Sequence, residues 1–317
     1  MVESPLPVID IDVFRRGGHD IDERVRGLDD ACREVGFFAI TGHGIDRPLT
    51  DYLLEQCRRF FDQPVVAKEA IAIGRSCNHT GYVGFAAERL QADIEPDAKE
   101  ALDLALEPAA LLPTGECQSA PISQMPALEH FDTTVIAYQR AAMEAATIVL
   151  RGLAIALDLR AGFFERRMRQ PSCNLRMVHY PPIDAEAHRE DVLGCGAHTD
   201  YGLVTLLLTD GVEGLEVRRR DGTWVRPEVP EGALVVNLGD MLARWTNDRY
   251  VSTPHRVTNP TDRHRYSVPF FVNPDADAVV EVMPSCVSGD EPARYEPVRA
   301  ADYLASRFDE THAYRVA

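Results

Sequence analysis

The chain has 317 residues, of which 45% are hydrophobic and 26% are charged, as in ordinary globular proteins. Its formal net charge is −17 at pH 7 and it contains no basic cluster, so we expect no nucleic-acid partner. No apolar run approaches the roughly 18 residues that a membrane-spanning helix needs. The first residues lack the basic and apolar regions of a secretory signal, so we expect neither a membrane partner nor secretion.

The cysteines favour a reduced, cytoplasmic protein. There are seven of them, an odd number, and they form no Cys-x-x-Cys pair. Cys195 stands three residues before His198, and we interpret it as a buried free thiol rather than a metal ligand. Because no flexible linker interrupts the sequence, we expect residues 1–317 to form a single domain, and the chain is compatible with a monomer.

The first half of the chain mixes short strands with amphipathic helices. The pattern predicts strands at 6–11 and 37–40, and helices at 22–35, after Asp46 and at 65–71. Residues 81–90 alternate glycine with aromatic and apolar residues, which is typical of a strand or loop near a bound molecule. Residues 109–126 are rich in proline and predict a surface loop. A long helix within 125–157 is expected to support the sheet from outside.

The second half reads as strands joined by turns, with short helices near 162–169 and 300–308. Strands are predicted at 175–180, 196–198, 203–208, 215–219, 233–238, 255–257, 266–272 and 279–282. Asp221-Gly222 is a hairpin signal. About eight strands with short turns fit a double-sheet jelly roll of the cupin type. The expected fold class is therefore α+β, a double-stranded β-helix core supported by the N-terminal helices and the long central helix.

One short motif has the spacing of a metal site. His198 and Asp200 lie two residues apart in a strand-like context, so their side chains point to the same side. His255 follows far downstream and must come from a neighbouring strand. Two imidazoles and a carboxylate are the facial triad of non-haem Fe(II) oxygenases, which leaves three positions of the ion open.

A second His-x-Asp motif tests this interpretation. His130 and Asp132 lie at the start of the long predicted helix. Residues two apart on a helix are rotated by about 200° around its axis, so they cannot share an ion. We therefore expect His130 to be a surface or packing histidine.

A carboxylate-binding pair follows the second histidine. Arg265 and Ser267 face the same way on a strand, and the Arg lies beside the apolar run 268–272. A guanidinium fork next to a hydroxyl is suited to a carboxylate.

Several longer stretches resemble the isopenicillin N synthase-like family of Fe(II)- and 2-oxoglutarate-dependent dioxygenases. They are LPVIDI, CREVGFFAITGHGI, GYVGF and KEALDL in the first half, and GAHTDYGLVTLLL, LVVNLGDMLARWTNDRYVSTPHRV and RYSVPFFVNP in the second. Residues 1–120 resemble the N-terminal non-haem dioxygenase region of this family, and residues 172–285 resemble its jelly-roll core.

The resemblance implies roles for individual residues. Fe(II) is held by His198, Asp200 and His255, and the distal carboxylate of 2-oxoglutarate by Arg265 and Ser267, assisted by Tyr180. Arg176 and Phe271 match substrate-pocket positions, and the weaker candidates are Asn78, Tyr82 and Phe85. The expected reaction consumes O2 and 2-oxoglutarate, gives succinate and CO2, and hydroxylates, desaturates or cyclises a small molecule. It needs no general base, so His179 and His264 are expected to be structural or exposed.

Two alternatives remain open at this point. The first is an oxidase of the same fold that needs no 2-oxoglutarate, such as isopenicillin N synthase or aminocyclopropane carboxylate oxidase, which keep Arg-x-Ser. The second is a non-catalytic β-barrel module that holds Zn(II) at the same three ligands. Structural zinc sites are usually closed by four protein ligands, which disfavours the second alternative.

Overall fold

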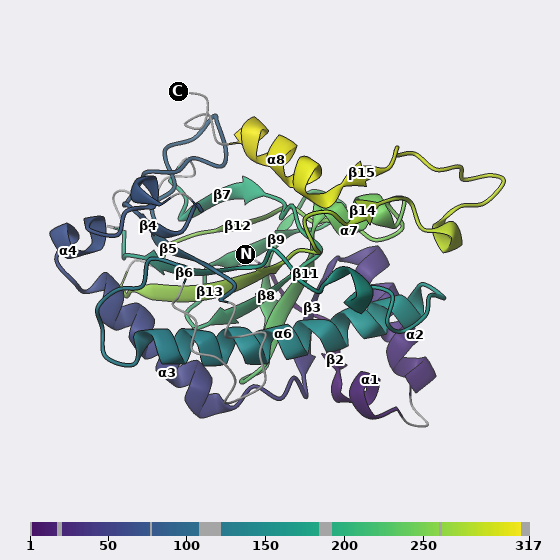
Figure 1. Cartoon of the computed structure of the whole chain (residues 1–317), viewed down its shortest axis with the longest axis horizontal. Coiled ribbons are helices and arrows are strands. Elements are labelled where there is room, and N and C mark those ends of the chain that lie inside the picture. Colours follow the sequence, from purple (N-terminus) through teal and green to yellow (C-terminus); the bar gives the residue numbers. More distant parts are fainter. Residues whose placement is uncertain are drawn as a thin grey trace.

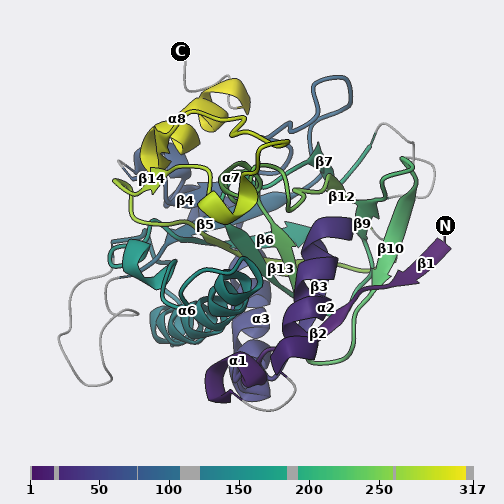
Figure 2. The ribbon, with the colours of Figure 1, turned by 90° about the vertical axis from the view of Figure 1, so that its right-hand side faces the viewer.

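The fold is built from two β-sheets whose inner faces share a core. The computed structural model describes residues 2–17, 21–76, 78–107, 122–183, 192–259 and 262–311. Two apolar clusters bridge the sheets: one joins Phe37 and Val235 of the larger sheet to Val217 of the smaller one, and the other joins Val178 to Val257. Figure 2 shows the strands of the two sheets with the helices packed to one side. This is the jelly-roll arrangement that the strand pattern predicts.

In the described part of the chain, the larger sheet has eight strands and the smaller sheet has five. The larger sheet runs β2 (Val8–Asp10), β3 (Phe37–Thr41), β11 (Leu234–Leu238), β8 (Val204–Thr209), β13 (Arg265–Val272), β6 (Asn174–Tyr180), β5 (Glu100–Ala105) and β4 (Gly81–Val83). The smaller sheet runs β1 (Val2–Pro5), β10 (Trp224–Glu228), β9 (Leu215–Arg218), β12 (His255–Val257) and β7 (Cys195–His198). A short ribbon pairs β14 (Val279–Val280) with β15 (Val298–Arg299).

Helices cover the outer face of the larger sheet (Figure 1). They are α1 (Asp12–Arg16), α2 (Ile21–Glu34), α3 (Arg47–Phe61), α4 (Val65–Glu69) and α6 (Phe131–Ala156), with α7 (Asp240–Trp245) and α8 (Ala300–Thr311) elsewhere. The long α6 packs on β8 and β13, and α3 packs on β6 and β13. Gly152 lets α1 approach α6, because a Cβ there would lie 2.8 Å from the Phe14 ring. The buried stripe of α6 packs against the outer face of the larger sheet, whose strand β13 carries Arg265 and Ser267.

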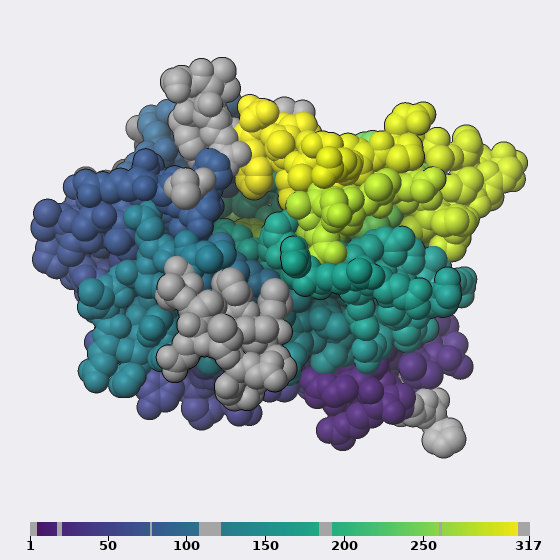
Figure 3. All heavy atoms as spheres, in the orientation of Figure 1, coloured from purple at the N-terminus to yellow at the C-terminus, as the bar shows by residue number. Residues whose placement is uncertain are grey.

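The surface view shows how the C-terminal part is placed. The segment that ends in α8 (yellow) runs along the upper edge of the face shown in Figure 3, above the band formed by α6 and the residues that follow it (teal). Among the described helices, none combines the length and the apolarity that a membrane crossing requires.

The expected strands and helices are largely present, with the following differences. The helix predicted at 162–169 is only a 3-10 turn at Glu165–Arg167. His130 precedes α6 with φ 63°, so it stands outside the helix on which we had placed it. The sequence pattern did not predict β1, β5, β10, β15, α1 or α7. The two helices are of five and six residues, which is less than two helical turns. Most of the loop predicted at 109–126 lies outside the described residues.

Candidate active site

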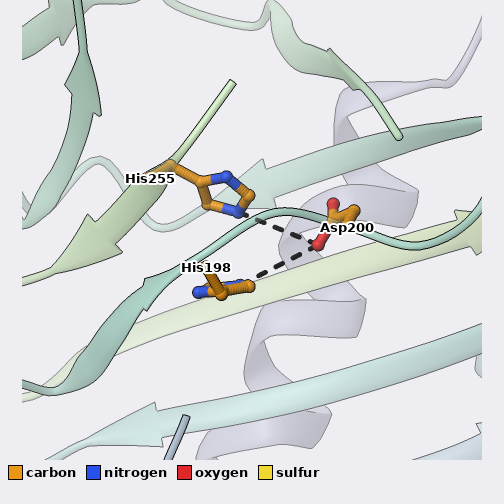
Figure 4. Close-up of side chains that lie close together, drawn as sticks. All are labelled: His198, Asp200 and His255. Atoms are coloured by element: carbon orange, nitrogen blue, oxygen red, sulfur yellow. Dashed lines mark ion pairs between the residues drawn. The ribbon is translucent and has the colours of Figure 1, made fainter. Parts of the chain in front are cut away.

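The three predicted metal ligands meet between neighbouring strands of the smaller sheet. β7 and β12 are antiparallel, and their register places His198 directly opposite His255. Asp200 follows β7 at once. Its Oδ1 lies 3.8 Å from Nε2 of His198 and 3.8 Å from Nε2 of His255 (Figure 4). The ligand atoms of the three residues lie within 4.8 Å of one another.

Backbone carbonyls orient both imidazoles. Nδ1 of His198 donates to the carbonyl of Gly196 at 2.8 Å, and Nδ1 of His255 donates to the carbonyl of Thr253 at 3.1 Å. A carbonyl can only accept, so each ring carries a proton on Nδ1, and its Nε2 faces Oδ1 of Asp200. Burial, with His198 next to it, lowers the pKa of His255 to about 4, which keeps its ring neutral.

Asp200 is held by one oxygen and leaves the other for an ion. Its Oδ2 accepts hydrogen bonds from Thr205 on β8 and from Asn237 on β11, the latter at 2.7 Å. Burial by itself would raise the pKa of Asp200, but His255, His198 and these two donors outweigh burial and lower it. The carboxylate is therefore ionised and presents Oδ1 between the two Nε2 atoms. Two imidazoles and one carboxylate are ligands that fit one face of an octahedral Fe(II).

A cavity of about 90 Å³ lies beside the cluster, between the two sheets. Its walls include Tyr180, Arg265 and Ser267 as well as the three metal-ligand candidates. A larger hollow of about 720 Å³ lies against α3 and the β8–β9 turn. That hollow touches Arg265 but none of the three ligand candidates, whereas the smaller cavity is lined by all of them.

Arg265 is buried in this cavity with an unused donor. Arg265 is 1% exposed, and its Nε donates to the carbonyl of Val212 at 3.2 Å. The guanidinium lies over the Tyr180 ring, 4.8 Å from its centroid. Its Nη1 is buried and has no hydrogen-bond partner among the described residues. A buried cation with a free donor is costly unless a ligand pairs with it, and a carboxylate is the matching partner.

Ser267 and Tyr180 complete this end of the cavity. Ser267 lies two residues after Arg265 on β13, and its side chain is hydrogen-bonded to the Tyr180 side chain. Burial is the main reason why the pKa of Tyr180 is raised, so its hydroxyl remains protonated. The three residues that we expected to share one carboxylate therefore do lie together.

Of the expected pocket residues, Arg176 and Phe271 line the cavity. Nη2 of Arg176 donates to both carboxylate oxygens of Glu88 at 2.7 Å and lies 3.6 Å from Asp103. Its positive charge is therefore already matched within the protein. Nε of the same side chain is buried without a partner, so one donor edge of Arg176 is unused.

The structure places Asn78, Tyr82 and Phe85 outside the cavity. On β4, Val83 faces the cluster between the sheets, so its neighbour Tyr82 points the other way, and its hydroxyl donates to Glu100 at 2.5 Å. Phe85 is 55% exposed. Asn78 is exposed, and its Nδ2 donates to the carbonyl of Ile122 at 2.8 Å.

The cysteine and the two histidines that we expected to lie outside the metal site do so, whereas two residues that hold Asp200 were not predicted. Cys195 is buried and does not belong to the metal-binding group. His179 and His264 are hydrogen-bonded to each other at 2.8 Å, away from the cavity. Thr205 and Asn237, which hold Asp200, were not predicted. The only sequence signal for them is a polar residue at an inward position of each buried strand.

Comparisons with known proteins agree with this geometry. The model of the 2OG-Fe(II) oxygenase superfamily matches residues 171–274, and the model of the non-haem dioxygenase N-terminal region in morphine synthesis matches residues 6–127. A "2-oxoglutarate-Fe(II) type oxidoreductase hxnY" of Emericella nidulans is 34% identical over 98% of this chain and 92% of its own length. A homoarginine-6-hydroxylase of Oryza sativa subsp. japonica is 32% identical over 95% of this chain and 96% of its own length.

Solved structures show the same relationship. A full-length Neurospora crassa protein crystallised with alpha-KG superposes with a TM-score of 0.85 at 26% identity, over 97% of this chain and 96% of that one. A 2OG-Fe(II) oxygenase family protein of Caulobacter crescentus gives a TM-score of 0.83 at 31% identity, over 97% of this chain and 99% of that one. The chain therefore belongs to the 2OG-Fe(II) oxygenase superfamily and is a non-haem Fe(II)- and 2-oxoglutarate-dependent dioxygenase of the isopenicillin N synthase-like type.

Proposed function

We propose that His198, Asp200 and His255 hold the Fe(II), and that Arg265, Ser267 and Tyr180 hold the distal carboxylate of 2-oxoglutarate. The observation that carries this proposal is the unused Nη1 of Arg265 in the same small cavity as the three ligand candidates. A guanidinium at one end and an open metal face at the other match a molecule with a carboxylate at one end and a keto acid at the other.

When bound, Fe(II) and 2-oxoglutarate supply oxidation of a C–H bond by O2, with succinate and CO2 as co-products. The protein's part is orientation. Thr205 and Asn237 donate to Oδ2 of Asp200 and favour its ionised form, so Asp200 would offer Oδ1 to the ion. The walls exclude bulk water, because apolar residues such as Val178, Leu207 and Val257 surround the polar groups.

We propose that the substrate is a small polar molecule that contacts Arg176 and Phe271. Both residues line the cavity, and the unused Nε of Arg176 suits a carbonyl or carboxylate oxygen. Two relatives support small polar substrates: the rice protein is named for homoarginine, and the Neurospora crassa protein was also crystallised with thymine. Because the negative charge of Glu88 neutralises the positive charge of Arg176, the cavity would bind a neutral carbonyl as well as an anion.

The test is a coupled measurement of product and succinate. Protein loaded anaerobically with Fe(II) is exposed to O2 with and without 2-oxoglutarate, across candidate substrates that include cyclic amides and amino acids. We expect succinate to form in step with oxidised product and no product without the keto acid. Full product formation without 2-oxoglutarate would instead support the oxidase alternative.

A further inference from the structure

A segment that carries none of the proposed ligands is bonded directly to the strand that bears His198. This segment, residues 84–98, which we call the strap, connects β4 to β5 and lies against β7. Asp97 Oδ1 accepts a hydrogen bond from the backbone N–H of Gly196 at 2.9 Å. Gln91 Oε1 accepts one from the N–H of Ala197 at 3.3 Å. The strap therefore binds the backbone on both sides of the Gly196 carbonyl.

That carbonyl is the group that orients the imidazole of His198. It accepts the Nδ1 hydrogen of His198 at 2.8 Å. The contact between the strap and Gly196 is too close for any side chain, because a Cβ on Gly196 would lie 2.9 Å from Cβ of Gln91 and 3.3 Å from Oδ1 of Asp97. Asp97 thus sets the position of the one residue whose carbonyl directs the His198 ring.

Asp97 is itself fully buried and paired with a buried cation. It is 0% exposed, and its Oδ2 lies 2.5 Å from Nζ of Lys99, a residue that is 4% exposed. The same Nζ lies 3.4 Å from Glu88 and 3.5 Å from Sγ of Cys195, the residue before Gly196. Burying such a pair costs about as much desolvation as the attraction returns. Stability alone therefore does not explain an ion pair at this place.

The second histidine has no such arrangement. His255 is oriented by the carbonyl of Thr253, and Thr253 is itself held by its hydroxyl, which donates to the carbonyl of Val35 at 2.6 Å. No charged group is part of that contact. The two imidazoles are therefore fixed by different means, one through neutral main-chain contacts and the other through a buried carboxylate.

We propose that Asp97 is a positioning residue for the metal site, acting through Gly196 on His198, and that Lys99 holds the Asp97 carboxylate in place through its contact with Oδ2. The inference rests on the proposed function through the role of His198 as a ligand. The strap would then contribute to metal affinity as well as to the substrate cavity, where its Glu88 holds Arg176.

The experiment compares two double variants that differ only in the acceptor. Asp97→Asn with Lys99→Met keeps an oxygen that accepts from Gly196, whereas Asp97→Leu with Lys99→Met removes it, and neither leaves an unpaired buried charge. Fe(II) dissociation constants are measured anaerobically on both, together with the ligand-field spectrum of the Co(II)-substituted proteins and the melting temperature of the metal-free proteins. The exposed Asp93→Asn on the same strap is the matched control.

We expect the Leu variant to bind Fe(II) about 10- to 100-fold more weakly than the Asn variant, as is typical when a group behind a ligand is lost. Its Co(II) spectrum should change, and Asp93→Asn should match the wild type in both measurements. If the Leu variant does not fold, Asp97→Ser with Lys99→Met replaces it, because the shorter hydroxyl does not reach Gly196.

Equal Fe(II) affinities and equal Co(II) spectra for the two double variants would overturn the inference, whatever their melting temperatures. The outcome is separable from that of the proposed function. If His198→Ala keeps its iron, the ligand assignment fails. If His198→Ala loses iron while the two double variants bind it equally, only the role of Asp97 fails.

Discussion

Among the described residues, two clusters contain two histidines and one carboxylate, and they differ in how far their ligand atoms are already hydrogen-bonded. The first is the proposed iron site of His198, Asp200 and His255, which we call the iron-site cluster; the second, which we call the Glu100 cluster, is formed by Glu100, His179 and His264. In the iron-site cluster each Nε2 lies 3.8 Å from Oδ1 of Asp200, which is too far for a hydrogen bond. Composition alone does not distinguish the two.

In the Glu100 cluster both carboxylate oxygens and both ring nitrogens of His179 already have hydrogen-bond partners. Oε1 of Glu100 is bonded to Nδ1 of His179 at 2.8 Å, and Oε2 accepts from Lys68 at 2.7 Å and from Tyr82 at 2.5 Å. The remaining nitrogen of His179 is bonded to His264. A lysine supplies the positive charge that a metal supplies elsewhere. The comparison teaches that a metal site is recognised by unsatisfied ligand atoms, not by residue types.

The largest effect is expected from breaking the iron-site cluster. Replacing His198, Asp200 or His255 by Ala should abolish stoichiometric Fe(II) binding and turnover while the fold is kept, because removing one of three ligands leaves too few to hold the ion. His179→Ala is the matched variant and should keep its iron. Metal content after anaerobic dialysis measures both, and full iron in His255→Ala would remove that residue from the site.

The second effect concerns the far end of the cavity. Arg265→Gln turns a charge-assisted contact into a neutral one, so 2-oxoglutarate binding should weaken by about 2–5 kcal/mol, or tens- to thousands-fold. Ser267→Ala should cost about 1 kcal/mol, since one neutral donor is lost. Iron binding should survive both changes. The apparent constant for 2-oxoglutarate is read from succinate formation, and an unchanged constant in Arg265→Gln would contradict the assignment.

The Glu100 cluster should show the opposite behaviour, a loss of stability with no loss of iron. Glu100→Gln leaves the buried Lys68 without a counter-charge, and breaking such a pair costs about 3 kcal/mol. Urea unfolding of the metal-free protein measures the change, and Fe(II) titration checks the site. Weaker iron binding with unchanged stability would show that the two clusters had been assigned the wrong way round.

The same cluster predicts how acid acts on the fold. Burial by itself would raise the pKa of Glu100, but hydrogen bonds from His179, Lys68 and Tyr82 lower it to about 2, below its ordinary value of 4.5. A carboxyl whose pKa is lower in the folded state stabilises the fold above its unfolded pKa. That contribution is lost as the pH falls from about 4.5 through about 2. The stability difference between wild type and Glu100→Gln should therefore shrink over this window, and a difference that stays constant would contradict the shift.

The smallest effect is expected at the second His-x-Asp motif. His130 is exposed before α6, where Nε2 lies 3.4 Å from Glu129. Replacing His130 and Asp132 together by Ala should change stability by no more than about 0.5 kcal/mol and leave iron content unchanged. Inductively coupled plasma analysis and thermal unfolding suffice, and a fall in iron without unfolding would show that the wrong motif had been chosen.

The sequence predicts most strands because inward residues alternate or run continuously apolar, and it predicts the ligand pair because i and i+2 share a face. It does not predict the groups that decide what these ligands do. Glu88 is 88 residues from Arg176 and Asp97 is 99 residues from Gly196 along the chain, so no local pattern predicts these contacts. Tyr82 was misplaced because its neighbour Val83, one position along β4, takes the inward face.

The most direct test of the central claim is the location of iron. Crystals grown anaerobically with Fe(II) and 2-oxoglutarate are measured at the iron absorption edge. We expect one anomalous peak among Nε2 of His198, Nε2 of His255 and Oδ1 of Asp200, with the co-substrate running from the peak to Arg265. A peak at Glu100, or a peak that does not contact all three ligands, would contradict the account.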